Sequence, residues 1–274
     1  MWNTKSTTVN YSNINIGDTI LHYAEEGSGS PVLFVHGAAA SMIHGQYLSA
    51  YLSKGYRFIS LSQRFHLPND PQSTGHYNAD QHANDLIRFI EALNLPPCKV
   101  IAHSYGCSVV LTAAAIRKDL FTKIILAEPS LAFLINDQER YQSIREERAE
   151  AFQRIRVCFE EGKSADAVAT LMRYANGSRG FIAFPEQIRW DMAANAGALH
   201  RMINEKSPSS LNSDMLKQLT APVTILLGRH CIPMYKAVAD EFSALVPGTT
   251  IRIIENAAHD MVYTQPRLIF PHIN

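Results

Sequence analysis

The sequence lacks an excess of charge of either sign, and it contains little cysteine. Among its 274 residues, Lys and Arg total 25 and Asp and Glu total 25, so the formal net charge is zero. This balance gives no field that would attract nucleic acid, an anionic membrane or a polyanionic substrate. The cysteines have neither metal-ligand spacing nor the density of a disulfide framework: Cys98, Cys107, Cys158 and Cys231. We therefore expect free thiols, as in a reducing cytoplasm, and no bound metal.

Long hydrophobic runs are also missing. No apolar stretch approaches the length of a membrane span, and residues 1–18 have neither the basic start nor the apolar centre of a signal peptide. With 46% hydrophobic and 18% charged residues, the composition is that of an ordinary globular protein. We expect a cytoplasmic protein, alone or as a homodimer, whose partner is a small molecule rather than a nucleic acid or a membrane.

The sequence does contain a regular alternation of short apolar runs and helical segments. The runs are typical of buried parallel strands and lie at 32–35, 57–61, 99–103, 123–127, 223–227 and 250–254. Helical spacing is found at 78–95, 105–117 and 233–245. Residues 8–11 and 19–24 are predicted to form an antiparallel pair before this series. Strand and helix in alternation, with right-handed crossovers, predict an α/β fold with a mostly parallel sheet.

One long stretch interrupts the alternation. Between residues 131 and 216 no strand-like run occurs, and helices are predicted at about 141–159, 164–175 and 185–204. We therefore expect an α/β core made of residues 1–129 and 217–274, with a helical insertion at residues 130–216.

The segment Ala102-His103-Ser104-Tyr105-Gly106 follows a predicted buried strand and opens an apolar helix. Small residues two positions before and after Ser104 allow a very tight turn, which would leave the serine Oγ exposed at the helix N-terminus. The pattern matches the nucleophile elbow Gly-x-Ser-x-Gly, with Ala102 in place of the first glycine. A match over five residues also arises by chance, so the surrounding sequence has to show whether this segment is a nucleophile elbow.

The context is the edge of the sheet where parallel strands end. Ser104, Glu128 and His259 each follow a predicted strand, and functional residues of such sheets collect at the carboxyl ends of the strands. A serine hydroxyl is a poor nucleophile near neutral pH and needs a base, for which imidazole has a suitable pKa. We therefore predict Ser104 as nucleophile and His259 as base.

Three segments together resemble the α/β-hydrolase superfamily. Residues 32–38 are similar to its strand and His-Gly-x loop, residues 100–106 to its elbow, and residues 256–259 to its final histidine loop. The resemblance implies an α/β-hydrolase fold, with a mostly parallel, eight-stranded sheet flanked by helices and the insertion as a helical cap. It also implies that the backbone N–H groups of Ala38 and Tyr105 hold the oxyanion.

The sequence departs from this family at the acid that should support the histidine. The family's aspartate usually follows the penultimate strand in a Gly-x-x-Asp pattern, where this chain has Cys231. A neutral thiol is a feeble hydrogen-bond acceptor. Glu128 is the predicted substitute, since some members carry the acid after this earlier strand; the alternative is a solvated or cap-facing carboxylate. Asp260 is expected to be structural because it is adjacent to His259.

Four residues are candidate substrate contacts. Gln63 and Arg64 lie where many relatives have an Arg-Gly-x-Gly loop, and they could bind a substrate carboxylate or carbonyl, although a structural ion pair is the commoner role for such an arginine. Cys231 and Trp190 are the other two, although aromatic residues of such an insertion more often pack than bind ligand.

These patterns predict a cofactor-free serine hydrolase that cleaves a small to medium, fairly apolar ester, thioester or lactone through an acyl-enzyme. One alternative is a non-hydrolytic enzyme, such as a lyase, a carbon–carbon bond-cleaving enzyme or a cofactor-free oxygenase, in which His259 acts as base on the substrate. A second is a binding protein without activity on the same scaffold, which the missing aspartate would favour.

Overall fold

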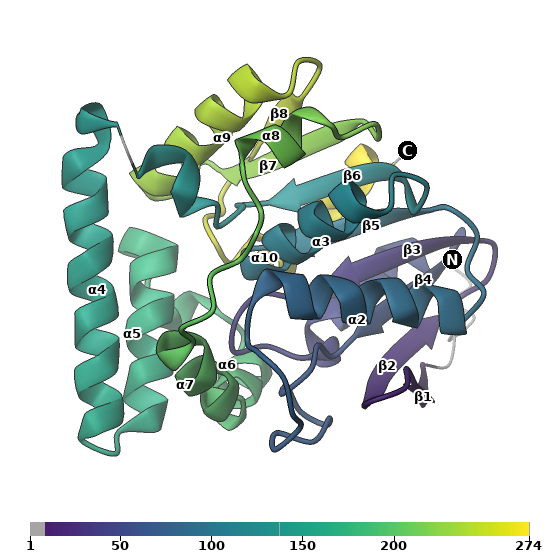
Figure 1. Ribbon diagram of the computed structural model, residues 1–274, viewed down its shortest axis with the longest axis horizontal. Helices are drawn as coiled ribbons and strands as arrows, with labels where there is room; N and C mark the ends of the chain where they lie inside the picture. The colour runs from purple at the N-terminus through teal and green to yellow at the C-terminus, as the bar shows by residue number, and fades with distance from the viewer. Residues whose placement is uncertain (1–8, 137, 274) are drawn as a thin grey trace, which may run out of the picture.

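The computed structural model describes residues 9–136 and 138–273. Its centre is an eight-stranded sheet in the order β1-β2-β4-β3-β5-β6-β7-β8, in which β1 and β2 pair antiparallel and the strands from β4 to β8 run parallel (Figure 1). The strands are β1 (Asn10–Asn15), β2 (Ile20–Glu26), β3 (Ser30–Val35), β4 (Tyr56–Leu61), β5 (Cys98–His103), β6 (Phe121–Ala127), β7 (Val223–Gly228) and β8 (Thr250–Ile254). The predicted α/β fold with a mostly parallel sheet is confirmed.

The N-terminal pair differs from the prediction in its bounds. The predicted strand at 8–11 begins at Thr8, which lies outside the described residues, and β1 continues instead to Asn15. The pairing of Ile14 with Leu21 extends the ladder, since the turn is confined to the residues around Gly17, whose φ of 108° suits glycine.

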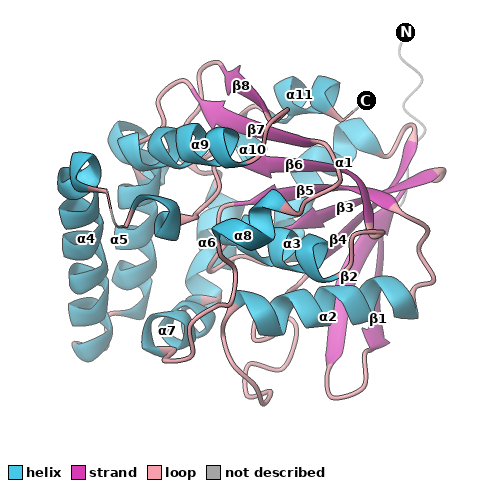
Figure 2. Cartoon of the chain, turned by 45° about the horizontal axis from the view of Figure 1, so that its top comes forward, coloured by secondary structure: helices cyan, strands magenta, loops and turns pink. Residues whose placement is uncertain are grey.

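Helices cover both faces of the sheet (Figure 2). One face carries α2 (Ala79–Ala92), α3 (Tyr105–Ile116), α8 (Ser213–Lys217) and α9 (Pro233–Leu245). The other carries α1 (Gln46–Leu52), α10 (Met261–Thr264) and α11 (Pro266–Ile269). The short C-terminal tail packs into this second layer, because Ile269 and Ile273 are fully buried. Central strands such as β3 and β7 are therefore apolar on both sides, as sandwiched parallel strands require.

Between β6 and α8 the chain forms a separate group of helices beside the carboxyl ends of the strands (Figure 1). They are α4 (Gln142–Glu160), α5 (Ser164–Asn176), α6 (Glu186–Ala194) and α7 (Ala196–Asn204). The single helix predicted at 185–204 is thus two helices. The break is at Asn195, whose side chain accepts the backbone N–H of Leu67 at 2.7 Å and so ties this point to the loop after β4.

Buried polar contacts join this helical group to the sheet layers. Asp191 of α6 accepts a hydrogen bond from Ser41 Oγ at 2.9 Å, and its Oδ2 lies 3.0 Å from Nε2 of the buried His44. Asp260 forms a 2.8 Å ion pair with Arg179. Asp260 therefore has a structural role, as its position next to His259 predicted.

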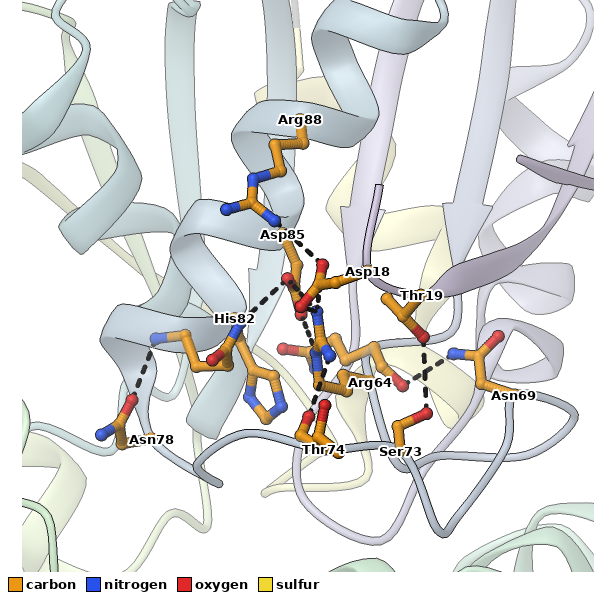
Figure 3. Close-up of polar contacts among 12 residues, drawn as sticks. Asp18, Thr19, Arg64, Asn69, Ser73, Thr74, Asn78, His82, Asp85 and Arg88 are labelled. Carbon is orange, nitrogen blue, oxygen red and sulfur yellow. Dashed lines mark hydrogen bonds and ion pairs between the residues drawn. The ribbon is translucent and has the colours of Figure 1, made fainter. Parts of the chain in front are cut away.

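The loop after β4 is held by a buried guanidinium (Figure 3). Arg64 has no exposed side-chain surface; it forms a two-pronged hydrogen bond with Asp85 of α2 at 2.7 and 2.8 Å and a further contact with Asp18 at 3.0 Å. Its remaining nitrogen donates to the carbonyl of Thr74 at 2.9 Å. Asp85 is the strongest of several influences that raise the pKa of Arg64. Through these hydrogen bonds the Arg64 guanidinium connects the loop after β4 with α2 and with the turn between β1 and β2.

We expect Asp85→Asn to lower the free energy of unfolding by about 3 kcal/mol, because it leaves the Arg64 charge buried with only the half-exposed Asp18 to compensate it. Urea denaturation of the purified protein measures this. The control is Asp119→Asn, which removes an exposed partner of Arg117 and should cause no measurable change. Equal effects of the two substitutions would contradict the role given to the buried pair.

Candidate active site

Ser104 lies at the apex of a tight turn between β5 and α3. Its φ of 54° and ψ of −118° form a backbone conformation that residues other than glycine rarely adopt. Ser104 and Tyr105 are partly exposed, while His103 before them and Gly106 after them are buried. The strand–turn–helix geometry expected of the elbow is therefore present around Ser104.

The turn brings α3 so close to the end of β3 that only small residues fit. A Cβ at Gly106 would lie 2.4 Å from the carbonyl oxygen of Val35 and 2.5 Å from that of His36. A Cβ at Gly37 would lie 3.0 Å from the Cβ of Ser104. These contacts explain in physical terms why the motif needs glycine at position 106.

His259 and Glu128 meet at the same edge of the sheet. The Nδ1 atom of His259 lies 2.8 Å from Oε2 of Glu128, and the other carboxylate oxygen accepts the backbone N–H of Gly228 at 3.0 Å. Glu128 is fully buried and His259 is 2% exposed. Burial raises the pKa of Glu128, and the hydrogen bonds from His259 and Gly228 oppose that rise. Glu128 therefore contacts the histidine and is not a solvated carboxylate.

Two aromatic rings flank the His259 imidazole. Tyr235, from the first turn of α9, is stacked on it with ring centroids 4.8 Å apart and planes 2° apart. Burial raises the pKa of Tyr235, and a hydrogen bond with Ser104 opposes that rise; the tyrosine hydroxyl is also 3.4 Å from Nε2 of His259. The His103 ring lies 4.4 Å from the imidazole, centroid to centroid, and its Nε2 donates to the His259 carbonyl at 3.0 Å. The tyrosine hydroxyl thus contacts both the serine and the histidine.

A cavity of about 860 Å³ opens over these residues. Ser104 and His259 line it on the sheet side, and residues of α4, α5, α6 and α7 line it on the other. Most of that other wall is apolar, and the following side chains contribute to it: Phe152, Leu171, Met172, Met192, Met202 and Ile203. Its size is that of a small-molecule site.

Ala38 and Tyr105 line the cavity next to Ser104. Tyr105 is the first residue of α3, so its backbone N–H has no acceptor within the helix. Ala38 follows the buried His36, which is held by its own contacts: its Nε2 accepts the backbone N–H of Gln63 at 3.0 Å, and the Gln63 side chain donates to its carbonyl at 2.7 Å. His36 is thus a structural histidine that orients the loop carrying Ala38.

None of the four predicted substrate contacts lines the cavity. Gln63 is buried and its side chain bonds the carbonyl of His36, and Arg64 is committed to its two aspartates. Trp190 is 72% exposed on α6, with its ring outside the cavity. Cys231 is partly buried, which raises its thiol pKa to about 11, and its side chain also lies outside the lining.

The cavity residues Tyr235, Arg148 and Arg156 were not predicted from the sequence. Tyr235 follows the predicted strand at 223–227 at no recognisable motif spacing, and its place over His259 depends on how α9 packs. Arg148 and Arg156 lie on the helix α4, whose many other charged residues conceal the two that line the cavity. In none of these cases does the local sequence indicate that the side chain faces a cavity.

Within residues 9–136 and 138–273, no group of three or more His, Cys, Asp or Glu side chains is placed to hold a metal ion. Over the same part of the chain, no helix has the length and apolar character needed to cross a membrane.

Comparison with known proteins identifies the family. The family model for the alpha/beta hydrolase fold matches residues 30–266. A 2-(acetamidomethylene)succinate hydrolase of Mesorhizobium japonicum is 25% identical over 93% of this chain and 90% of its own length. An epoxide hydrolase of Caballeronia sordidicola is 26% identical over 86% of this chain and 72% of its own length.

Solved structures share the fold. Carboxylesterase CesB from Bacillus subtilis superposes with a TM-score of 0.76 at 14% identity, over 97% of this chain and 90% of that one. The structure of an E-2-(acetamidomethylene)succinate hydrolase superposes with a TM-score of 0.68 at 21% identity, over 97% of this chain and 98% of that one. The family model, which spans most of the chain, and the eight-stranded sheet with its serine elbow show that this protein belongs to the α/β-hydrolase fold family.

Proposed function

We propose that the protein is a serine hydrolase that cleaves an ester, thioester or lactone of small to medium size through an acyl-enzyme. The observation that carries the proposal is the 2.8 Å contact between the buried Glu128 and His259, since His259 lines one cavity with the elbow serine Ser104. Two relatives, from Mesorhizobium japonicum and Caballeronia sordidicola, are named as hydrolases, which supports hydrolysis on this fold.

In the proposed reaction, Ser104 Oγ attacks the substrate carbonyl carbon while its proton passes to Nε2 of His259. Glu128 holds the Nδ1–H of the imidazole and stabilises the imidazolium that forms. The backbone N–H groups of Ala38 and Tyr105 stabilise the negative oxygen of the tetrahedral intermediate. His259 then protonates the leaving group, and a water molecule, activated by the same histidine, hydrolyses the acyl-serine.

The helices α4 to α7 would act as a cap over this reaction. They supply the apolar wall of the cavity, which would hold the acyl chain and keep most water away from the intermediate. A cap built from residues 130–216 on a core of residues 1–129 and 217–274 is the domain arrangement that we propose.

The contact of Glu128 with His259 also bears on the two alternatives. The replacement of the usual aspartate by Cys231 is the reason to consider a binding protein without activity. The contact of Glu128 with His259 weakens that reason, because it offers the histidine another acid. A non-hydrolytic enzyme would use His259 as base and Ser104 only as a hydrogen-bonding group. Comparing Ser104→Ala with His259→Ala distinguishes this case, since the serine would then be dispensable.

A fluorophosphonate probe should label Ser104 covalently, because a serine activated by a neighbouring histidine attacks the phosphorus as it would a carbonyl. Mass spectrometry of the labelled peptide identifies the site. Ser104→Ala should abolish labelling and lower hydrolysis of p-nitrophenyl esters by about a thousandfold or more. Ser108→Ala, one helical turn further on, should still be labelled. Folded protein that resists the probe and leaves every ester intact would refute the proposed function.

Glu128→Gln should lower kcat for ester hydrolysis by roughly a hundredfold to ten-thousandfold, because an amide cannot stabilise the imidazolium. Cys231 occupies the position where the family usually carries its acid, so Cys231→Asp in the Glu128→Gln background should restore part of the lost rate. The control is Glu255→Gln, which removes an exposed partner of Arg229 near the same loop. An unchanged kcat in Glu128→Gln would rule out Glu128 as the acid.

A further inference from the structure

Two arginines of α4 line the cavity that contains Ser104. Arg148, Phe152 and Arg156 follow one another at intervals of four residues, so they lie on successive turns of one helix face, and all three line the cavity. The Arg148 guanidinium lies over the Phe152 ring at 4.5 Å from its centroid. Arg148 is partly buried and Arg156 is exposed, so the pair runs from the interior of the cavity to its rim.

Neither arginine forms an ion pair with a carboxylate in the part of the chain that the structure describes. Arg154, on the same helix but outside the cavity, does form one, with Glu150 at 3.1 Å. Guanidinium groups that are withdrawn from water are usually matched by a carboxylate or phosphate. The cavity therefore contains cationic groups for which the described residues supply no counter-ion.

The surroundings of Arg148 make this arrangement costly without an anion. Burial lowers the pKa of Arg148, and the like charge of Arg156 acts in the same direction. Arg148, Tyr174 and Tyr235 line the same cavity as Ser104. A substrate bound at Ser104 therefore shares this cavity with the Arg148 guanidinium.

The charge of the lining indicates how many negative charges the ligand carries. Apart from histidines, the ionised lining residues are Arg148, Arg156 and Glu205, which sum to one positive charge. Glu205 counts as ionised because it accepts backbone N–H groups of Ser207, Lys206 and Tyr77, which hold its pKa at about 2. A net charge of plus one over the lining suits a singly charged carboxylate better than a doubly charged phosphate.

We propose that Arg148, with Arg156 at the rim, binds a carboxylate of the substrate, which makes the substrate a monoanionic ester or thioester with an apolar body between the scissile bond and the carboxylate. A guanidinium pairs with a carboxylate through two parallel hydrogen bonds, so it selects both charge and orientation. This inference rests on the proposed hydrolysis and names its substrate class. It adds a charged end to the fairly apolar substrate expected from the sequence.

Two matched esters test this substrate class: mono-p-nitrophenyl adipate, which ends in a carboxylate, and p-nitrophenyl hexanoate, which ends in a methyl group. For the wild-type protein, kcat/KM should be higher for the adipate ester. In Arg148→Gln, the ratio of the two kcat/KM values should fall roughly tenfold to a hundredfold, mainly through KM, because a charge-assisted hydrogen-bond pair is lost. Arg148→Lys, which keeps the charge without the planar fork, should give an intermediate ratio.

The matched control is Arg154→Gln, which removes a charge from the same helix outside the cavity and should leave the ratio unchanged. Raising the salt concentration should lower the preference of the wild-type protein for the adipate ester, since screening weakens a partly exposed charge pair. A ratio that is the same in Arg148→Gln as in the wild type would overturn the proposed carboxylate site.

Calorimetric binding separates this inference from the hydrolysis on which it rests. The monoamide of adipate, a monoanion with the length of the adipate ester, should bind the wild-type protein and bind Arg148→Gln at least tenfold more weakly, whether or not either ester is cleaved. If neither ester is hydrolysed but binding of the monoamide depends on Arg148, the proposed reaction fails and the carboxylate site stands. If both esters are hydrolysed and binding of the monoamide is independent of Arg148, the site fails and the reaction stands. Arg148-dependent binding of inorganic phosphate in preference to the monoamide would contradict the choice of a carboxylate.

Discussion

The architecture of the site depends on the close approach of the first turn of α3 to the end of β3. The backbone of Gly106 lies against the carbonyl groups of Val35 and His36 with no room for a Cβ, and the same turn holds Ser104 at a positive φ. Strain of this kind persists only where the surrounding packing over-determines it, and here the carboxyl-terminal halves of β3, β5 and β6 are buried on both faces. The contact of Gly106 with Val35 and His36 therefore fixes Ser104 close to the loop that carries Ala38.

The placement of Glu128 follows from the order of the strands. Because β6 lies between β5 and β7, a carboxylate at its end is next to the backbone N–H of Gly228 and reaches the imidazole of His259. The two hydrogen bonds offset part of the cost of burying its charge. An acid at this point contacts Nδ1 of the histidine, and Tyr235 stacks on a face of the same ring.

The inserted helices decide what such a site would accept. They bury one face against the sheet layers through contacts such as Asp191 with Ser41 and His44, and they turn another face toward the cavity. That second face is mostly apolar, with Arg148 and Arg156 as its cations. The residues at the strand ends would thus carry out the reaction, and the inserted helices would select the substrate. Such a separation is expected when one fold serves many functions.

The sequence by itself determined the elements whose signals are local. Apolar periodicity predicted the parallel sheet, and small residues around Ser104 predicted the tight turn, because both depend on backbone geometry a few residues long. Tertiary structure alone decided which side chains meet. Arg64 pairs with Asp85 instead of facing a ligand, Trp190 points to solvent, and Tyr235 stacks on His259. Such contacts join residues far apart in the chain, and their partners are set by how the layers pack, which no local pattern encodes.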